Sequence, residues 1–266
     1  MPLINTYEIG KVALHYHELD STNAEAIRLL HSNQPPKAGT VIRADYQTAG
    51  RGQAGNYWHS SLGQNLLFSV VLYPEGFAAG ELFRLTQVLC LSVAAVLQKH
   101  FENQNDVAQT IRIKWPNDVY VGERKIAGIL VQNSLQGQQV KWSVAGVGLN
   151  VNESDFPTEL QKTATSLRQL SHSKESISLK HCLAEITATL KSKLEYYGQP
   201  SRYPALDAAY HSLLYRRDIP SKFRRTATGT SFAGTIRGVQ PDGRLQIEKE
   251  GGAIELFDLK SIAFER

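Results

Sequence analysis

The N-terminal part of the chain shows both strand and helix periodicity. Polar and apolar residues alternate over positions 14–18, which predicts a short strand. Thr22 and Glu25 have the spacing of a capping box and mark the start of a helix. Two more strands are predicted at Thr40–Ala44 and Leu66–Tyr73. The second is apolar over most of its length, so we expect both of its faces to be buried.

A long apolar stripe at helical spacing follows, and it predicts a helix from about Gly80 to Phe101. The polar segment Glu102–Gln109 is expected to form a surface loop. Four strands are then predicted so close together that no helix fits between them, and we expect antiparallel neighbours joined by hairpins. These strands are Ile111–Lys114, Val119–Val121, Ile126–Gln132 and Trp142–Asn152.

The character of the chain changes after Tyr215. Before it, helices are predicted over Leu179–Tyr197 and around Ala205–Leu214, and after it only short alternating strands. The sequence therefore predicts an α+β fold: a mixed β-sheet with helices over residues 1–214, followed by a small β-barrel domain over residues 215–266. The C-terminal strands are Phe232–Val239, Arg244–Glu248 and Ile254–Phe257.

Composition excludes two classes of protein. With 42% hydrophobic and 20% charged residues, the chain has enough apolar surface to fold, and no apolar run approaches the roughly 20 residues of a membrane-spanning helix. Cys90 and Cys182 sit among apolar residues, which favours buried thiols in a reducing compartment. No secretory signal is recognised, so we expect a cytoplasmic protein. The net charge of +4 raises the expectation of an anionic partner without identifying it.

A glycine cluster lies in the loop predicted over Gln47–Gln64. Its sequence Gly50-Arg51-Gly52-Gln53-Ala54-Gly55 matches G-x-G-x-x-G. A dinucleotide-binding fold needs a helix directly after these glycines, whereas here a strand follows, so that fold is excluded. What remains is a backbone that a ligand can approach closely beside the cation of Arg51. An ordinary flexible loop is the alternative interpretation.

The run Lys114-Trp115-Pro116-Asn117-Asp118 places a cation and two oxygen-bearing side chains on a turn after a strand. A phosphate group with a bound Mg²⁺ requires such a set, because the ammonium faces the anion and the oxygens face the hard metal. The alternative is a simple Pro-Asn turn with an exposed lysine.

Glycines interrupt two of the predicted strands. Gly128 follows Lys125 in one strand, and Gly146 and Gly148 precede Asn150 in the next. Glycine weakens a strand unless something must approach its backbone closely. Their combination in one mixed sheet therefore indicates a ligand site.

Other catalytic classes are not indicated. The sequence contains no serine-hydrolase elbow, no His-Glu-x-x-His motif and no P-loop. His15 and His17 would share a strand face, but two ligands without a third make a poor zinc site.

Taken in order, these motifs closely resemble the biotin protein ligase family. Order and approximate spacing agree over Leu14–Leu170, and the C-terminal β domain resembles the family's SH3-like barrel. The matching segments are Ser21-Thr22-Asn23, Gln47-Thr48-Ala49-Gly50-Arg51-Gly52 with Trp58, Lys114-Trp115-Pro116-Asn117-Asp118, Lys125-x-x-Gly128-Ile129-Leu130 and Gly146-Val147-Gly148-Leu149-Asn150-Val151-Asn152.

The resemblance implies a two-step reaction with biotin, ATP and Mg²⁺. The biotin carboxylate attacks the α-phosphate of ATP, giving biotinoyl-AMP and pyrophosphate. A lysine of a biotin carboxyl carrier protein then attacks this intermediate. By resemblance, Lys114 is catalytic and bridges the carboxylate and the α-phosphate, while Arg51 covers the acyl-phosphate.

The same resemblance assigns the remaining ligand contacts. The residues implied to bind biotin are Ser21, Thr22, Asn23, Gln47, Gly50, Arg51, Gly52, Gln53, Lys114, Gly128 and Gly148. Those implied to bind the nucleotide are Arg51, Trp58, Lys114, Asn117, Lys125 and Asn150, with Asn117 and Asp118 on the Mg²⁺ side.

Two departures from the family pattern carry expectations. Many members have an arginine after Gly-Arg-Gly where this chain has Gln53, so we expect weaker retention of biotinoyl-AMP. Some relatives carry an N-terminal DNA-binding domain, whereas here the pattern begins within the first 25 residues, so we expect no repressor function and no specific DNA binding.

Two alternatives remain open. Lipoate–protein ligation is related chemistry, and the basic runs Arg216-Arg217 and Lys222-Phe223-Arg224-Arg225 would suit a nucleic-acid-binding module. These arginines could instead meet an acidic carrier domain. The sequence is compatible with a homodimer but does not decide the oligomeric state.

Overall fold

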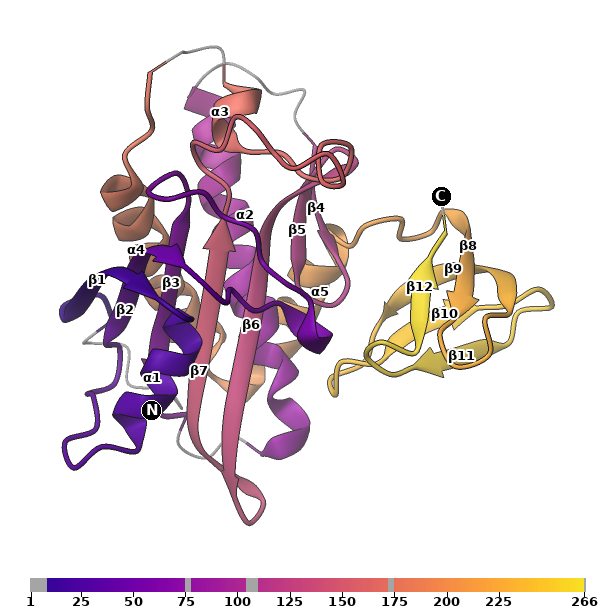
Figure 1. The fold of residues 1–266 in the computed structure, drawn as a ribbon. Helices are drawn as coiled ribbons and strands as arrows, with labels where there is room; N and C mark the ends of the chain where they lie inside the picture. Colours follow the sequence, from indigo (N-terminus) through magenta and orange to yellow (C-terminus); the bar gives the residue numbers. More distant parts are fainter. Residues whose placement is uncertain (1–8, 75–77, 104–109, 172–174, 266) are drawn as a thin grey trace.

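A seven-stranded mixed sheet forms the larger part of the protein (Figure 1). The computed structural model describes residues 9–74, 78–103, 110–171 and 175–265. The strand order is β1-β2-β3-β7-β6-β5-β4, and β1 pairs with β2 in parallel while all the other neighbours are antiparallel. The strands are β1 Ala13–Leu19, β2 Val41–Gln47, β3 Leu66–Leu72, β4 Ile111–Lys114, β5 Asp118–Val121, β6 Arg124–Gln136 and β7 Gln139–Leu149.

Helices cover both faces of this sheet. On one face, α1 packs on Ile42, Val71 and Val144. On the other face, α2 and α4 pack on alternate residues such as Val41 and Val70. Every residue of β3 is therefore buried, as its apolar sequence predicts. The helices are α1 Thr22–Leu30, α2 Phe83–Asn103, α3 Leu167–Leu170, α4 Leu179–Tyr197 and α5 Tyr203–Ser212, with short 3₁₀ turns η1 Gln53–Gly55, η2 Ala79–Glu81 and η3 Pro200–Arg202.

The C-terminal part forms a second, five-stranded antiparallel sheet beside the first (Figure 1). Its order is β11-β10-β9-β8-β12. The predicted α+β fold with a mixed sheet is confirmed, whereas closure of the second sheet into an SH3-like barrel and the boundary at residues 214 and 215 stay predictions. The strands are β8 Pro220–Arg225, β9 Ser231–Val239, β10 Leu245–Glu248, β11 Ile254–Phe257 and β12 Ile262–Phe264.

The second sheet contacts the turn between β4 and β5. The indole nitrogen of Trp115 donates a 2.8 Å hydrogen bond to the carbonyl of Gly243. The hydroxyl of Tyr210 in α5 donates to the carbonyl of Pro116 at 2.9 Å. Gly243 itself packs on Phe83 and has φ +94°, a conformation that favours glycine. The turn that carries Lys114 is thus held from two sides.

The cysteines and the longest apolar helix both lie in the core. Cys90 and Cys182 are free and buried, as predicted. Helix Ala79–Glu102 is long and apolar enough to cross a membrane, but 78% of its most apolar window is buried inside the protein, as in a core helix. Most of the predicted surface loop, residues 104–109, lies outside the described residues.

Candidate active site

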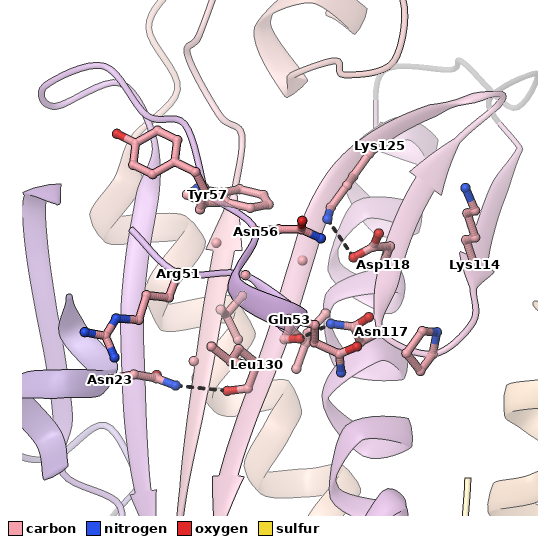
Figure 2. Close-up of a pocket in the computed structure, with 18 of the residues that line it drawn as sticks. Asn23, Arg51, Gln53, Asn56, Tyr57, Lys114, Asn117, Asp118, Lys125 and Leu130 are labelled. Atoms are coloured by element: carbon pink, nitrogen blue, oxygen red, sulfur yellow. Dashed lines mark hydrogen bonds and ion pairs between the residues drawn. The ribbon is translucent and has the colours of Figure 1, made fainter. Parts of the chain in front are cut away.

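A cavity of about 370 Å³ opens at the carboxyl ends of β4 and β7 and over the middle of β6 (Figure 2). All the predicted site residues except Gly50 and Asn150 line it. Strand β12 of the second sheet and the turn before it also contribute to its wall, through Ile262, Phe264 and Lys260, which the sequence analysis did not select. Residues far apart in the chain therefore meet in one pocket, as the motif order predicts.

The start of α1 forms one end of the cavity. The amide of Thr22 donates to Gln47 Oε1 at 2.7 Å, so a side chain from β2 satisfies a helix N-terminal donor. The predicted capping box is wrong: Ser21 is the N-cap residue, and it makes no capping hydrogen bond through its side chain. Ser21, Thr22 and Gln47 are all buried polar residues at the pocket, as expected of a site that binds a polar ring.

Asn23 is held in one orientation by a polar cluster. Its Nδ2 donates to Gln132 Oε1 at 2.9 Å and to the carbonyl of Leu130 at 3.2 Å. The hydroxyl of Ser69 lies 2.6 Å from Asn23 Oδ1 and 2.8 Å from Thr22 Oγ1. The sequence analysis missed Ser69 and Gln132. The available signal was Ser69 itself, a polar residue in the apolar strand β3.

The strand glycines make room for two side chains. A Cβ on Gly146 would overlap Asn23 Oδ1. A Cβ on Gly148 would lie 2.5 Å from Trp58 Cε2, and one on Gly128 would lie 2.9 Å from Trp58 Cζ3. The prediction of a close approach at these glycines is confirmed, and in this structure the groups that approach are the indole of Trp58 and the amide of Asn23.

The loop with Arg51 folds back on itself across the cavity. The amide of Trp58 donates to the carbonyl of Gly50 at 3.0 Å, and that of Gly52 donates to the carbonyl of Asn56 at 2.7 Å. A Cβ on Gly50 would lie 2.6 Å from the Trp58 carbonyl oxygen, so glycine is required there although Gly50 does not line the cavity. The loop is thereby closed into a short hairpin.

The guanidinium of Arg51 is exposed at the mouth of the cavity, where Figure 2 shows it pointing away from Lys114. Its charge reaches Asp20. Hydrogen bonds from Arg28 lower the pKa of Asp20 to about 2, and the Arg51 charge acts in the same direction. Asp20 is therefore an anion within the influence of the Arg51 charge.

Lys114 lies at the end of β4 between two aromatic rings. Its Nζ lies 5.0 Å from the centre of the Phe264 ring and 5.2 Å from that of Tyr120. It also lies 3.4 Å from the Tyr120 hydroxyl. Figure 2 places its side chain apart from the pair formed by Lys125 and Asp118. Lys114 thus lines the part of the cavity that faces Phe264 of the second sheet.

Lys125 and Asp118 form an ion pair inside the cavity, with Lys125 Nζ 2.7 Å from Asp118 Oδ1. The same Nζ lies 5.3 Å from the centre of the Trp58 ring. Asn117 is buried, and its Nδ2 donates to the carbonyl of Ile129. In the described part of the chain, no cluster of three or more His, Cys, Asp or Glu side chains could hold a metal.

Asn150 does not face the cavity. It is buried, its Nδ2 donates to the carbonyl of Thr165 at 3.0 Å, and its amide donates to the carbonyl of Ile126 at 2.9 Å. Its side chain fixes the segment that follows β7, and its role as a nucleotide ligand stays a prediction. Spacing alone cannot tell which of two neighbouring residues faces a pocket.

The basic residues near the second sheet are paired with carboxylates. Arg225 Nη2 lies 2.6 Å from Glu255, and Arg216 lies 3.7 Å from Glu123. Phe223, between the basic residues, is buried and belongs to strand β8, which the sequence analysis missed because its polar neighbours mask it. Paired arginines without exposed aromatic neighbours disfavour the nucleic-acid-binding alternative.

Comparisons with known proteins agree with this geometry. Residues 17–150 match the model of the biotin/lipoate A/B protein ligase family. The chain is 30% identical over 257 residues to a bifunctional ligase/repressor BirA of Bacillus subtilis, covering 96% of this chain and 74% of that protein. It is 29% identical over 238 residues to a biotin–[acetyl-CoA-carboxylase] ligase of Paracoccus denitrificans, covering 88% and 92%.

Solved structures agree as well. The fold superposes on a biotin protein ligase from Aquifex aeolicus in complex with biotin and ATP with a TM-score of 0.77 and 28% identity, over 96% of this chain and 99% of that one. Fold, cavity and motif order therefore point to the same group of proteins. The chain belongs to the biotin/lipoate A/B protein ligase family, and within it to the biotin protein ligases.

Proposed function

We propose that the cavity catalyses the ATP-dependent attachment of biotin to a lysine of a carrier protein. The observation that carries this proposal is the meeting, in one pocket, of the polar cluster around Asn23, the loop of Arg51 and the turn of Lys114. In the first step the biotin carboxylate attacks the α-phosphate of ATP, and pyrophosphate leaves. In the second step the carrier lysine attacks the acyl carbon, an amide forms, and AMP leaves with the electron pair of the broken acyl–phosphate bond.

Different ends of the cavity would hold the biotin ring and the reacting groups. Thr22, Asn23 and Gln47 lie at the polar end of the slot, which suits the ureido ring of biotin because that ring both donates and accepts hydrogen bonds. Lys114 supplies positive charge at the end of β4, and Arg51 would add to it by turning inward from the mouth when a carboxylate and a phosphate come together. We therefore propose that biotin lies between the polar residues at α1 and Lys114 at the end of β4, beside the Trp58 indole that covers Gly128 and Gly148.

The nucleotide would lie beside Trp58, Lys125 and Asp118, where both an aromatic face and a cation are available. The donor set fits Mg²⁺ only in part, because Asp118 is a single carboxylate that is paired with Lys125, although Asn117 donates only its Nδ2 to Ile129 and keeps Oδ1 as an oxygen ligand. Mg²⁺ often binds through one carboxylate together with substrate phosphates, and it would neutralise phosphate charge when bound. Asp118 would hold it on the phosphate side.

The proposed partner is the biotin carrier of a carboxylase. The relative from Paracoccus denitrificans is named for acetyl-CoA carboxylase, which supports a carrier of that class. Phe264 of β12 and Lys260 of the turn before it line the same cavity, so the carrier would approach past the second sheet as well as the first.

Isothermal calorimetry with biotin and with lipoate tests the substrate. We expect heat of binding with biotin and none with lipoate, because the polar cluster at α1 offers partners to a ureido ring that a dithiolane ring cannot satisfy. Binding of lipoate without binding of biotin would overturn the proposal.

Gln53→Arg tests the weaker retention of the intermediate. Gln53 lines the cavity in η1, so an arginine there adds a cation beside the adenylate. We expect biotinoyl-AMP to dissociate about ten- to a hundredfold more slowly, in line with the roughly 1.5–3 kcal/mol of a hydrogen bond to a charged group. Dissociation is measured by stopped-flow fluorescence, and an unchanged rate in the variant would contradict the expectation.

A further inference from the structure

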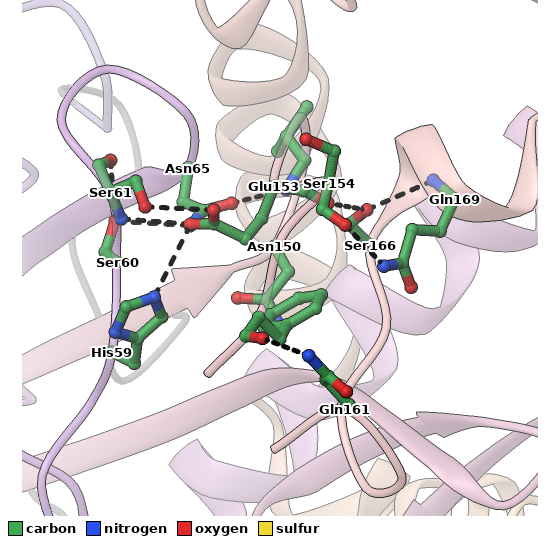
Figure 3. A network of polar contacts seen from close by, with 12 residues as sticks. His59, Ser60, Ser61, Asn65, Asn150, Glu153, Ser154, Gln161, Ser166 and Gln169 are labelled. Carbon is green, nitrogen blue, oxygen red and sulfur yellow. Dashed lines mark hydrogen bonds and ion pairs between the residues drawn. The ribbon is translucent and has the colours of Figure 1, made fainter. Parts of the chain in front are cut away.

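Glu153 is a buried carboxylate just after β7, outside the cavity (Figure 3). Its side chain is only 4% exposed. Ser61 donates to it twice, from its amide and from its hydroxyl, each at 2.9 Å. Asn65 Nδ2 donates a third hydrogen bond at 2.9 Å, and His59 Nε2 lies 3.9 Å away. A carboxylate is buried only where donors satisfy it, so residues 59–65 are held around this charge.

The same network joins the ends of two strands. Asn65 directly precedes β3, and its Oδ1 accepts a 3.0 Å hydrogen bond from the amide of Val151. The hydroxyl of Ser166 donates to the carbonyl of Glu153 at 2.5 Å. Two residues into β3, Leu67 pairs with Gly148 of β7, and both line the cavity. The network therefore fixes the strand ends that carry the cavity wall.

The residues that Glu153 holds, 59–65, directly follow the loop from Gly50 to Trp58. Trp58 precedes His59, and its ring lies on Gly148. The amide of Trp58 donates to the carbonyl of Gly50 at 3.0 Å, so the two ends of the loop are joined to each other. A shift of residues 59–61 would therefore displace both Trp58 and the backbone beside Arg51.

We propose that Glu153 is a positioning residue for biotin and its adenylate. Through Ser61 and Asn65 it holds the loop from Gly50 to Trp58 closed over the cavity, although it touches no ligand itself. This role rests on the proposed biotin ligation. A carboxylate serves here because three donors converge on it, and a glutamine would present its own N–H groups to at least one of them.

Glu153→Gln tests the role with two readouts. Trypsin cleavage after the exposed Arg51, followed by mass spectrometry without substrate, reports whether the loop is closed. Biotin-dependent ATP–pyrophosphate exchange gives KM for biotin and kcat. We expect cleavage several-fold faster and KM for biotin raised about tenfold, with a smaller change in kcat, because hydrogen bonds to a charged group are lost. Glu159→Gln, an exposed glutamate of the same segment, is the matched control.

Ser61→Ala removes one of the three hydrogen bonds and should shift both readouts in the same direction by a smaller factor. If Glu153→Gln lowers Tm but leaves cleavage and KM at the wild-type values, Glu153 is merely structural and the proposal is overturned. Absence of exchange in the wild type would instead refute biotin ligation, and cleavage after Arg51 would still decide whether Glu153 holds the loop.

Discussion

Replacing Lys114 with alanine should abolish most of the biotin-dependent ATP–pyrophosphate exchange. The first step brings a carboxylate and a phosphate together, and negative charge accumulates on the phosphate in the transition state. A preorganised charge at such a position is worth about a hundredfold or more in rate. Lys114 lies on the turn that Trp115 and Pro116 anchor to the rest of the fold, so its backbone is fixed before any ligand arrives.

The matched control is Lys141→Ala, an exposed lysine on β7 outside the cavity, which should keep wild-type exchange. Thermal denaturation of Lys114→Ala should stay near the wild type, because Lys114 is partly exposed and its contacts are with ring faces and a hydroxyl. Full exchange in Lys114→Ala would show that another cation carries the step.

Gly146→Ala should disrupt the biotin end of the cavity. The added Cβ would overlap Asn23 Oδ1 and lie 2.9 Å from Asn23 Cγ, so the Asn23 side chain must move. Its hydrogen bonds to Ser69 and Gln132 would then break. Overpacking of this kind costs about 1–3 kcal/mol of stability. We expect a loss of that size in urea denaturation and a fall in biotin affinity of about a hundredfold.

Gly80→Ala is the matched control, because nothing lies within 4 Å of a Cβ there. The double variant Asn23→Ala/Gly146→Ala separates packing from recognition. It should recover part of the lost stability, since the overlapping amide is gone, but it should not recover biotin affinity. Wild-type biotin affinity in Gly146→Ala would contradict the placement of biotin beside Asn23.

Much of the fold could be predicted because periodicity reports burial directly. The apolar strand β3 and the long stripe of α2 are buried as their patterns require. Strand β8 was not predicted, because only Phe223 among its central residues is buried and its arginines pair with carboxylates on neighbouring segments. A strand with a single buried side chain, whose polar residues pair with residues far away in the sequence, shows no alternation of polar and apolar positions.

The candidate site was predicted from residue types at set spacings. The differences between the predicted residues and those that line the cavity have a common cause. Asn150 and Gly50 lie within matching motifs, yet they act through hydrogen bonding and close packing behind the cavity. Ser69, Gln132 and Phe264 lie outside every motif, and only the folded sheets bring Phe264 to the pocket and Ser69 and Gln132 to Asn23 beside it. Side-chain direction within a motif is decided by tertiary packing, which one sequence does not report.

Biotin-dependent ATP–pyrophosphate exchange by the wild-type protein tests the central claim most directly. Exchange measures the reversal of adenylate formation. It therefore requires the carboxylate substrate, ATP and a cavity in which the carboxylate attacks the α-phosphate of ATP. We predict exchange when biotin is added, and none without biotin or with lipoate in its place. Exchange that proceeds without biotin, or only with lipoate, would contradict the assignment of this cavity to biotin activation.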